Sequence, residues 1–186
     1  MALTVIYDSC VLYPNYLRDL LIRLARTGIV RACWTERILS EVRNNLRENR
    51  GIASEKLTRL TDLMTAAVPN CIVTEYEDLE PSVALPDPDD LHVMAAAVQA
   101  GAQQIVTANL KDFPKAVLAP FDIEAVSPDQ FVLNQVEDRP GVVAQVVVEA
   151  AGDCHAPPLA VAELLSIYSR SGLVRSAAAL RDLMAT

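Results

Sequence analysis

The sequence predicts an α/β fold with a central parallel sheet, followed by a helical extension at the C-terminal end. Short apolar runs rich in β-branched residues alternate with longer segments whose apolar residues recur at helical spacing. Residues 3–7 form an almost unbroken apolar run, which is typical of a strand buried on both faces of a parallel sheet. Residues 139–186 show helical periodicity without strand alternation, which predicts the extension.

The first part of the chain contains the expected sheet. Strands are expected at 3–7, 29–34, 71–74, 104–107 and 123–126. Helices are expected between them at about 17–26, 35–49, 54–67 and 88–100. Thr35 favours a helix start, and Gly51 and Gly101 favour helix ends. Strands that alternate with helices imply right-handed crossovers and therefore a parallel sheet.

We therefore predict two parts, an α/β domain over residues 1–126 and a helical extension over residues 127–186. Ser127, Pro128 and Gln130 form a helix-start pattern at the boundary. Apolar helical segments follow around 141–151, 158–170 and 173–184. The extension contains no cluster of catalytic residue types, so we expect it to pack on the domain or on a partner.

Composition excludes several classes of protein. The four cysteines show no C-x-x-C spacing and only two histidines are available, which disfavours a zinc site and predicts reduced thiols. Aromatic residues make up only 5%, which disfavours a surface that stacks bases. No G-x-G-x-x-G or P-loop pattern is present. No basic stretch precedes the short first apolar run, so we expect a cytoplasmic protein without a membrane span.

Charge is distributed unevenly along the chain. Residues 1–60 hold ten Lys/Arg and six Asp/Glu, whereas residues 61–130 hold two Lys/Arg and twelve Asp/Glu. A basic flank beside an acidic region would suit a polyanion whose backbone meets acid-bound metal ions. The simpler interpretation, that charged faces are only solvated faces, stays open.

Three acidic residues are expected at one edge of the sheet. Asp8 ends the first strand, and ligands of open α/β sheets bind beyond the carboxyl ends of the strands. Glu41 lies at the edge of a buried helical stripe, and Asp90 precedes the next apolar helix. Each also has a structural interpretation: Asp8 as a turn residue, Glu41 as a surface partner of Arg37, and Asp90 with Asp87 as part of a helix cap.

The loop after the strand at 104–107 should lie beside Asp8. It offers Asn109 and Asp112 as further oxygen donors, although Asp112 could equally form a surface pair with Lys111. Clustered carboxylates repel each other, and a divalent cation relieves that repulsion. Oxygen donors favour Mg²⁺ or Mn²⁺, which would support hydrolysis of a phosphodiester.

Four segments resemble the successive motifs of PIN-domain proteins over residues 3–126. They are Val5-Ile-Tyr-Asp8-Ser9, Trp34-Thr-Glu-Arg-Ile-Leu-Ser-Glu41, Asp90-Leu-His-Val-Met-Ala-Ala-Ala97 and Ile105-Val-Thr-Ala-Asn-Leu-Lys-Asp-Phe-Pro114. The resemblance implies a three-layer α/β/α PIN-like fold and a metal-dependent ribonuclease, usually the toxin of a VapBC-type toxin–antitoxin pair. It also implies that Asp8, Glu41 and Asp90 are the metal-binding catalytic acids and that Ser9 is a supporting hydroxyl.

The resemblance further implies an RNA substrate and an antitoxin partner, and it leaves a homodimer open. The candidates for holding RNA phosphates are Arg18, Arg23, Arg26, Arg43 and Arg47. Many family members carry an aspartate where Asn109 stands, so one alternative is a degenerate PIN domain that binds RNA or protein without cutting. A phosphatase using Asp8 as nucleophile ranks last, because such enzymes usually need a second aspartate where this chain has Cys10.

Overall fold

The central sheet forms from the short apolar segments that the sequence predicts. In the computed structural model, which describes residues 2–82, 84–155 and 158–185, the described residues form a four-stranded parallel sheet of order β2-β1-β3-β4. The strands are β1 (Leu3–Tyr7), β2 (Val30–Cys33), β3 (Gln104–Val106) and β4 (Glu124–Val126). The predicted α/β fold is confirmed.

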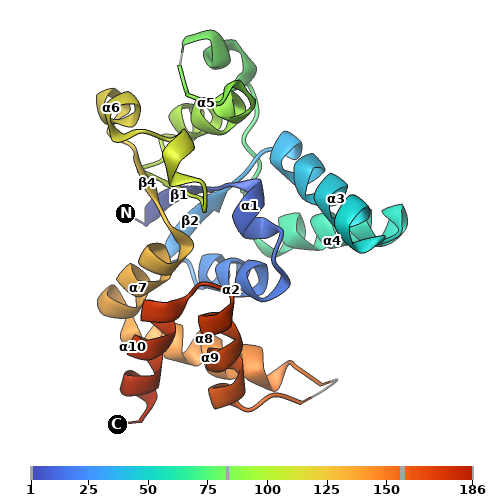
Figure 1. The fold of residues 1–186 in the computed structure, drawn as a ribbon, viewed down its shortest axis with the longest axis vertical. Helices are drawn as coiled ribbons and strands as arrows, with labels where there is room; N and C mark the ends of the chain where they lie inside the picture. The colour runs from blue at the N-terminus through green and yellow to red at the C-terminus, as the bar shows by residue number, and fades with distance from the viewer. Residues whose placement is uncertain (1, 83, 156–157, 186) are drawn as a thin grey trace.

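Helices flank this sheet and then continue as the C-terminal part (Figure 1). They are α1 (Ser9–Leu12), α2 (Asn15–Arg26), α3 (Glu36–Arg50), α4 (Ser54–Ala67), α5 (Leu91–Ala100), α6 (Lys115–Leu118), α7 (Pro128–Asp138), α8 (Pro140–Gly152), α9 (Val161–Arg170) and α10 (Val174–Met184). Short 3-10 turns are η1 (Glu77–Ser82), η2 (Pro88–Asp90), η3 (Leu110–Asp112) and η4 (Ala119–Phe121). Within the described residues, no helix combines the length and apolar character needed to cross a membrane.

The register of the strands determines which residues meet at the carboxyl edge of the sheet. Tyr7 of β1 lies opposite Val106 of β3, and Val106 lies opposite Val126 of β4. The residues that follow, Asp8 and Thr107, therefore leave the sheet side by side. The backbone N–H of Asp8 still donates to the carbonyl of Val106 at 3.2 Å, which holds Asp8 at the strand end.

Helix caps explain several of the boundaries. The Thr35 hydroxyl accepts a hydrogen bond from the backbone N–H of Ile38 at 3.1 Å, so α3 begins where the sequence predicts. Gly51 ends α3 with a φ of 61°, a left-handed conformation that glycine adopts without a steric penalty. The Asp87 carboxylate caps η2 by accepting from the N–H of Asp89 at 3.0 Å.

One local prediction was wrong, and one short helix was not predicted. Residues 71–74 do not form a strand: they make a single parallel bridge between Ile72 and Trp34, just beyond the end of β2. The turn at Asn70 (φ 57°) and the turn at Glu75 (φ 60°) leave too little extended chain between them for a longer ladder. The sequence also gave no indication of α1, a single helical turn that begins directly after Asp8.

The C-terminal helices share the hydrophobic core with the sheet. Phe131 of α7 packs edge-on against Tyr7 of β1, with 5.8 Å between the ring centroids. α8 and α9 pack against α2, and Arg23 of α2 forms an ion pair with Asp153 at 2.9 Å. In Figure 1 these orange and red helices lie beside α2, at the opposite side of the sheet from α5.

Candidate active site

Asp8 presents a buried carboxylate at the carboxyl end of β1. Its side chain is held mainly through one oxygen: Oδ2 accepts hydrogen bonds from the Thr107 hydroxyl at 2.7 Å and the Cys10 thiol at 3.0 Å. The Oδ1 atom receives only the longer contact from the Ser9 hydroxyl, at 3.4 Å. Since Asp8 is 3% exposed, these neutral donors replace the water that would otherwise solvate its charge.

Cys10 and Thr107 bring the loop after β3 onto Asp8. Burial and the neighbouring Asp8 charge raise the pKa of the Cys10 thiol to about 12, so it remains a neutral donor. The Thr107 hydroxyl accepts from the backbone N–H of Asn109 at 3.0 Å, and the N–H of Ala108 donates to the Cys10 sulfur at 3.2 Å. These hydrogen bonds therefore join the loops after β1 and β3 around Asp8.

Asp90 lies where η2 meets α5, and its pKa depends on its burial and on the charges around it. Burial, followed by the charges of Asp8, Asp87 and Asp112, raises the pKa of Asp90 to about 6, while His92 acts in the opposite direction. These acids therefore act on Asp90 electrostatically. The raised pKa of Asp90 therefore reflects its burial first, and then the carboxylates that share this edge of the sheet.

Glu41 faces the same region from α3 but has cationic or hydrogen-bonding partners. The Nε2 atom of His92 donates to its Oε1 at 2.9 Å, and the Arg37 Nε lies 3.8 Å from the same oxygen. Burial tends to raise the pKa of Glu41, but His92, Ser9 and Arg37 outweigh burial and lower the pKa overall. Glu41 is therefore an anion at neutral pH.

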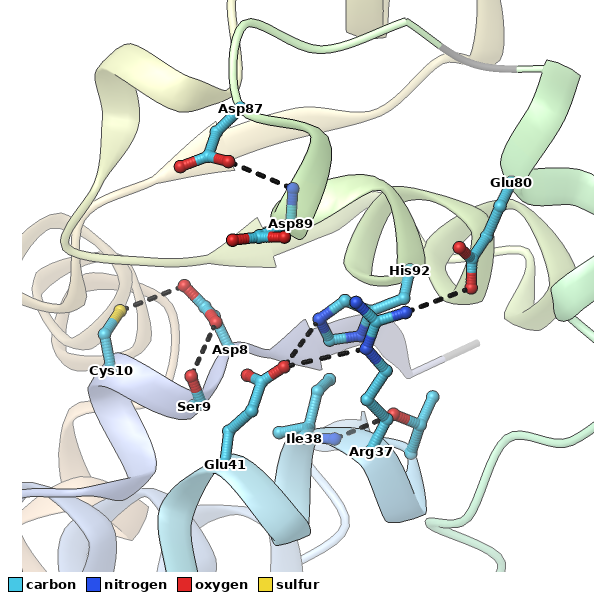
Figure 2. A network of polar contacts seen from close by, with 11 residues as sticks. Asp8, Ser9, Cys10, Arg37, Ile38, Glu41, Glu80, Asp87, Asp89 and His92 are labelled. Atoms are coloured by element: carbon cyan, nitrogen blue, oxygen red, sulfur yellow. Dashed lines mark hydrogen bonds and ion pairs between the residues drawn. The ribbon is translucent and has the colours of Figure 1, made fainter. Parts of the chain in front are cut away.

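Ser9 connects the two acids structurally. Its hydroxyl donates to Asp8 at 3.4 Å, and hydrogen bonding with Ser9 also helps to lower the pKa of Glu41. Figure 2 shows the Asp8 side chain above Ser9 and the Glu41 side chain to its right, with His92 and Arg37 on the far side of Glu41 from Ser9. The charge of Asp8 also helps to raise the pKa of Asp90, so all three predicted acids belong to one region at the carboxyl edge of the sheet.

Comparison with known families agrees with this geometry. A family model described as "PIN domain" matches residues 4–111, more than half of the chain.

The chain belongs to the PIN-domain family.

A second family model, described as "VapC50 C-terminal domain", matches residues 128–182. The chain is also 52% identical over 48 residues to a protein named "Putative ribonuclease VapC50" from Mycobacterium tuberculosis. That match covers 26% of this chain and 28% of the relative, so it relates only a short segment of the two proteins. No solved structure matches the chain.

The acidic edge of this PIN domain fits a divalent cation by its chemistry. Its donors are carboxylate oxygens, and the charges of Asp8, Asp87 and Asp112 add to burial in raising the pKa of Asp90, a repulsion that a cation would relieve. Among the residues that the structure describes, no three acidic, histidine or cysteine side chains are grouped closely enough to form a metal site as they stand. Glu41 in particular is turned toward His92 and Arg37.

The auxiliary residues differ in their access to this edge. The Asp112 side chain is 15% exposed, and its charge helps to raise the pKa of Asp90. The Nζ atom of Lys111, whose side chain is 85% exposed, lies 4.0 Å from the Asp112 carboxylate. Asp87 caps η2 and also acts on Asp90, so its capping and electrostatic roles coexist. Asn109 is exposed and contributes its backbone N–H to Thr107.

The five arginines suggested for RNA binding lie in different settings. Arg18 is buried and donates to the carbonyls of Leu12 and Tyr13 at 2.9 and 3.0 Å, which ties α2 to the preceding turn. On the same helix, Arg23 pairs with Asp19 and Asp153, and the exposed Arg26 lines a 170 Å³ cavity with residues of α8.

The two candidates on α3 are nearer to Glu41 in sequence. Arg43 pairs with Glu36 at 2.6 Å and donates to the Thr61 hydroxyl at 3.2 Å. The exposed Arg47 donates to the side-chain oxygen of Asn44 at 3.0 Å. Arg47 is therefore the more accessible of the two.

Sequence reasoning missed three residues that hold the acids in place. Thr107 follows the strand beside β1, so its position in the predicted sheet could have revealed its contact with Asp8. His92 sits inside an apolar helical stripe, where a polar side chain needs a partner. Cys10 gave no comparable signal, because an isolated cysteine beside an apolar run is usually a buried thiol.

Proposed function

We propose that the protein is a Mg²⁺- or Mn²⁺-dependent endoribonuclease that hydrolyses RNA phosphodiester bonds in the cytoplasm, as the toxin of a VapBC-type toxin–antitoxin pair. Membership in the PIN-domain family and the partial match to a VapC50 protein support this proposal. The observation that carries it is the buried Asp8 carboxylate at the carboxyl end of β1, whose charge acts on Asp90 together with the charges of Asp87 and Asp112. Such an edge attracts a divalent cation.

Asp8 and Asp90 would hold the cation, with Glu41 and Asp112 as additional oxygen donors. When bound, the cation would polarise the phosphoryl group and lower the pKa of a water molecule. Thr107 and Cys10 restrain Oδ2 of Asp8, so Oδ1 is the oxygen left with the weaker contact. Arg47 and the neighbouring face of α3 would contact RNA phosphates.

Glu41 would orient water rather than donate a proton. The lowered pKa of Glu41 keeps its carboxylate ionised, so its oxygens are hydrogen-bond acceptors at neutral pH. Ser9, which contacts Asp8, supplies a hydroxyl donor beside this carboxylate. Together they would position a water against the scissile phosphate.

The test is an RNA-cleavage assay on the purified full chain with Mg²⁺, with Mn²⁺ and with EDTA. We expect cleavage in either metal, none in EDTA, and none in Asp8→Asn. Asp62→Asn is the matched control, because Asp62 is an exposed carboxylate on α4 that makes no contact with the site residues described above. Cleavage that persists in EDTA or in Asp8→Asn would contradict the proposal.

The same assay distinguishes the binding-module alternative. Asn109 stands where many family members have an aspartate, and its exposed side chain adds no charge to the edge. A degenerate PIN domain would bind RNA and release it intact even at millimolar Mn²⁺. We favour the nuclease because Asp8, Asp90 and Glu41 are all present.

We also propose a small antitoxin protein as partner. A toxic ribonuclease must be restrained until it is released, and the acidic edge offers carboxylates that an arginine of the partner could bind. The open reading frame beside the gene should encode this protein, and co-expression with it should abolish toxicity. Size measurement of the free protein and of the complex would decide whether the PIN domain forms a homodimer.

A further inference from the structure

We propose that His92 is a positioning residue for Glu41, an inference that rests on the proposed nuclease function. The Nε2 atom of His92 donates to Oε1 of Glu41 at 2.9 Å, so this oxygen is restrained. His92 does not need to touch the substrate for this role. Its role is to orient the carboxylate of Glu41, which would contact the substrate.

Because His92 is buried, its imidazole serves the contact with Glu41 and not a contact with solvent. The side chain is 1% exposed and is followed along α5 by the buried residues Val93 and Met94. Within the described part of the chain, the Nδ1 atom of His92 is buried without a hydrogen-bond partner. An apolar side chain would fill this position without leaving a polar atom unpaired, so packing alone does not account for the imidazole.

The contact of Glu41 with the cation of Arg37 is weaker than its contact with His92. The Arg37 Nε is 3.8 Å from Oε1, and the Arg37 side chain is 44% exposed. Its Nη1 atom is also directed to Glu80 of η1 at 3.5 Å, so its charge is shared between two carboxylates (Figure 2). His92 therefore provides the short and buried contact that restricts Glu41, whereas Arg37 contributes mainly from the solvent side.

The position of His92 on α5 links two of the acids. Asp90 lies directly before α5, and His92 is the second residue of that helix. One rigid segment therefore carries an acid of the cluster and the residue that restrains Glu41. The arrangement parallels Asp8, where Thr107 and Cys10 restrain a single oxygen in the same manner. Asp8 and Glu41 are therefore each oriented by a donor from a neighbouring element of the PIN domain.

A matched pair of variants tests the proposal. His92→Gln and His92→Met have side chains of similar length, but only glutamine retains a donor that can reach Glu41. The full chain would be assayed for Mn²⁺ affinity by electron paramagnetic resonance, for kcat and KM on RNA, and for its unfolding temperature. We expect His92→Met to weaken Mn²⁺ binding and lower kcat by about 10- to 100-fold, with KM within about twofold, and His92→Gln to recover most of both.

A double-mutant cycle with Glu41→Gln separates positioning from a general loss of structure. If His92 acts through Glu41, adding His92→Met to Glu41→Gln should weaken Mn²⁺ binding by no more than about twofold further. Equal Mn²⁺ affinity in His92→Met and His92→Gln, or losses that multiply in the double variant, would overturn the proposal. If His92→Met fails to fold, His92→Gln still tests the proposal, because its Mn²⁺ affinity must then equal that of the wild type.

Mn²⁺ binding also separates this inference from the nuclease proposal. A wild-type protein that binds Mn²⁺ but leaves RNA intact would contradict the nuclease function, while the binding measurements would still decide the role of His92. A wild-type protein that binds no Mn²⁺ would overturn both.

Discussion

The carboxylates on the two sides of the candidate site have opposite electrostatic surroundings. On the β1 and η2 side, Asp8 accepts hydrogen bonds from neutral donors, and burial together with the charges of Asp8, Asp87 and Asp112 raises the pKa of Asp90 to about 6. On the α3 side, His92 and Arg37 lower the pKa of Glu41 against the effect of its burial. The negative charge is therefore compensated on one side and left uncompensated on the other.

This difference assigns separate tasks to the acids. A cation gains most where carboxylates repel each other, which places its main attraction at Asp8 and Asp90. Glu41 is already compensated by His92, so it is ionised and oriented whether or not a cation is present. We therefore expect variants on the first side to change metal binding most, and variants on the second side to change the rate of the chemical step.

The largest effect should come from Asp8→Asn. The substitution removes a buried negative charge, so we expect Mn²⁺ affinity and RNA cleavage each to fall by at least about 100-fold. Without metal, the same variant should be no less stable to heat than the wild type, because the repulsion between Asp8 and Asp90 is gone. Calorimetry in EDTA measures this, and a marked loss of stability would show that the Asp8 charge supports the fold.

Asp90 should make the stability of the metal-free protein depend on pH. Folding raises the pKa of Asp90 from 3.8 to about 6, so its stabilising contribution is complete below pH 3.8 and is lost as pH rises through about 6. In EDTA, the free energy of unfolding of the wild type should fall by about 2 kcal/mol relative to Asp90→Asn between pH 4 and pH 7. Urea titrations at each pH measure this difference.

Mg²⁺ should reverse that loss at neutral pH, since the cation binds the ionised carboxylates of the folded protein. The stabilisation by Mg²⁺ should therefore be greater at pH 7.5 than at pH 5. Parallel pH curves for the wild type and Asp90→Asn in EDTA would show that the acids of this edge are too far apart to repel each other.

Thr107→Val should have an intermediate effect. Valine has nearly the shape of threonine but leaves Oδ2 of Asp8 with only the Cys10 thiol, so we expect a loss of about 2 kcal/mol in unfolding free energy. Cleavage should fall by about tenfold because Asp8 is less restrained. Ser176→Ala is the control: Ser176 is also buried, on α10, and its hydroxyl donates to the Asp129 carboxylate at 2.7 Å, so its loss should lower stability without changing cleavage per folded molecule.

The smallest effect should come from Arg37→Ala. Both of its ion pairs are long and partly exposed, at 3.8 Å to Glu41 and 3.5 Å to Glu80, so the loss of stability should be about 0.5 kcal/mol or less. We expect cleavage to change by no more than about threefold. A loss as large as that of His92→Met would show that Arg37, and not His92, controls Glu41.

Much of the fold was predictable because local signals agreed with each other. β1 ends at the predicted strand end, and α3 begins at the Thr35 cap and ends at Gly51. The predicted strand at 71–74 failed because pairing depends on how much extended chain the flanking turns leave, which periodicity does not report. α1 was missed because a four-residue helix is too short to show a periodic pattern.

The site was predictable in its acids but not in their surroundings. Strand order and helix starts were enough to bring Asp8, Asp90 and Glu41 toward one edge of the sheet. The orientation of Glu41 depends on His92, a residue 51 positions later whose side-chain direction follows from how α5 packs on β1, β3 and η1. Such contacts between side chains of distant elements are not encoded in the spacing of residues along one helix.

The edge-on contact between Phe131 and Tyr7 has a practical consequence for anyone who divides this chain. Tyr7 immediately precedes Asp8, so the aromatic ring that braces the last residue of β1 comes from beyond the segment matched by the PIN-domain family. A truncated protein that stops at residue 126 would lack Phe131, so the part of the Tyr7 ring that Phe131 covers would be exposed to water. We expect such a fragment to aggregate, and its inactivity would say nothing about the nuclease.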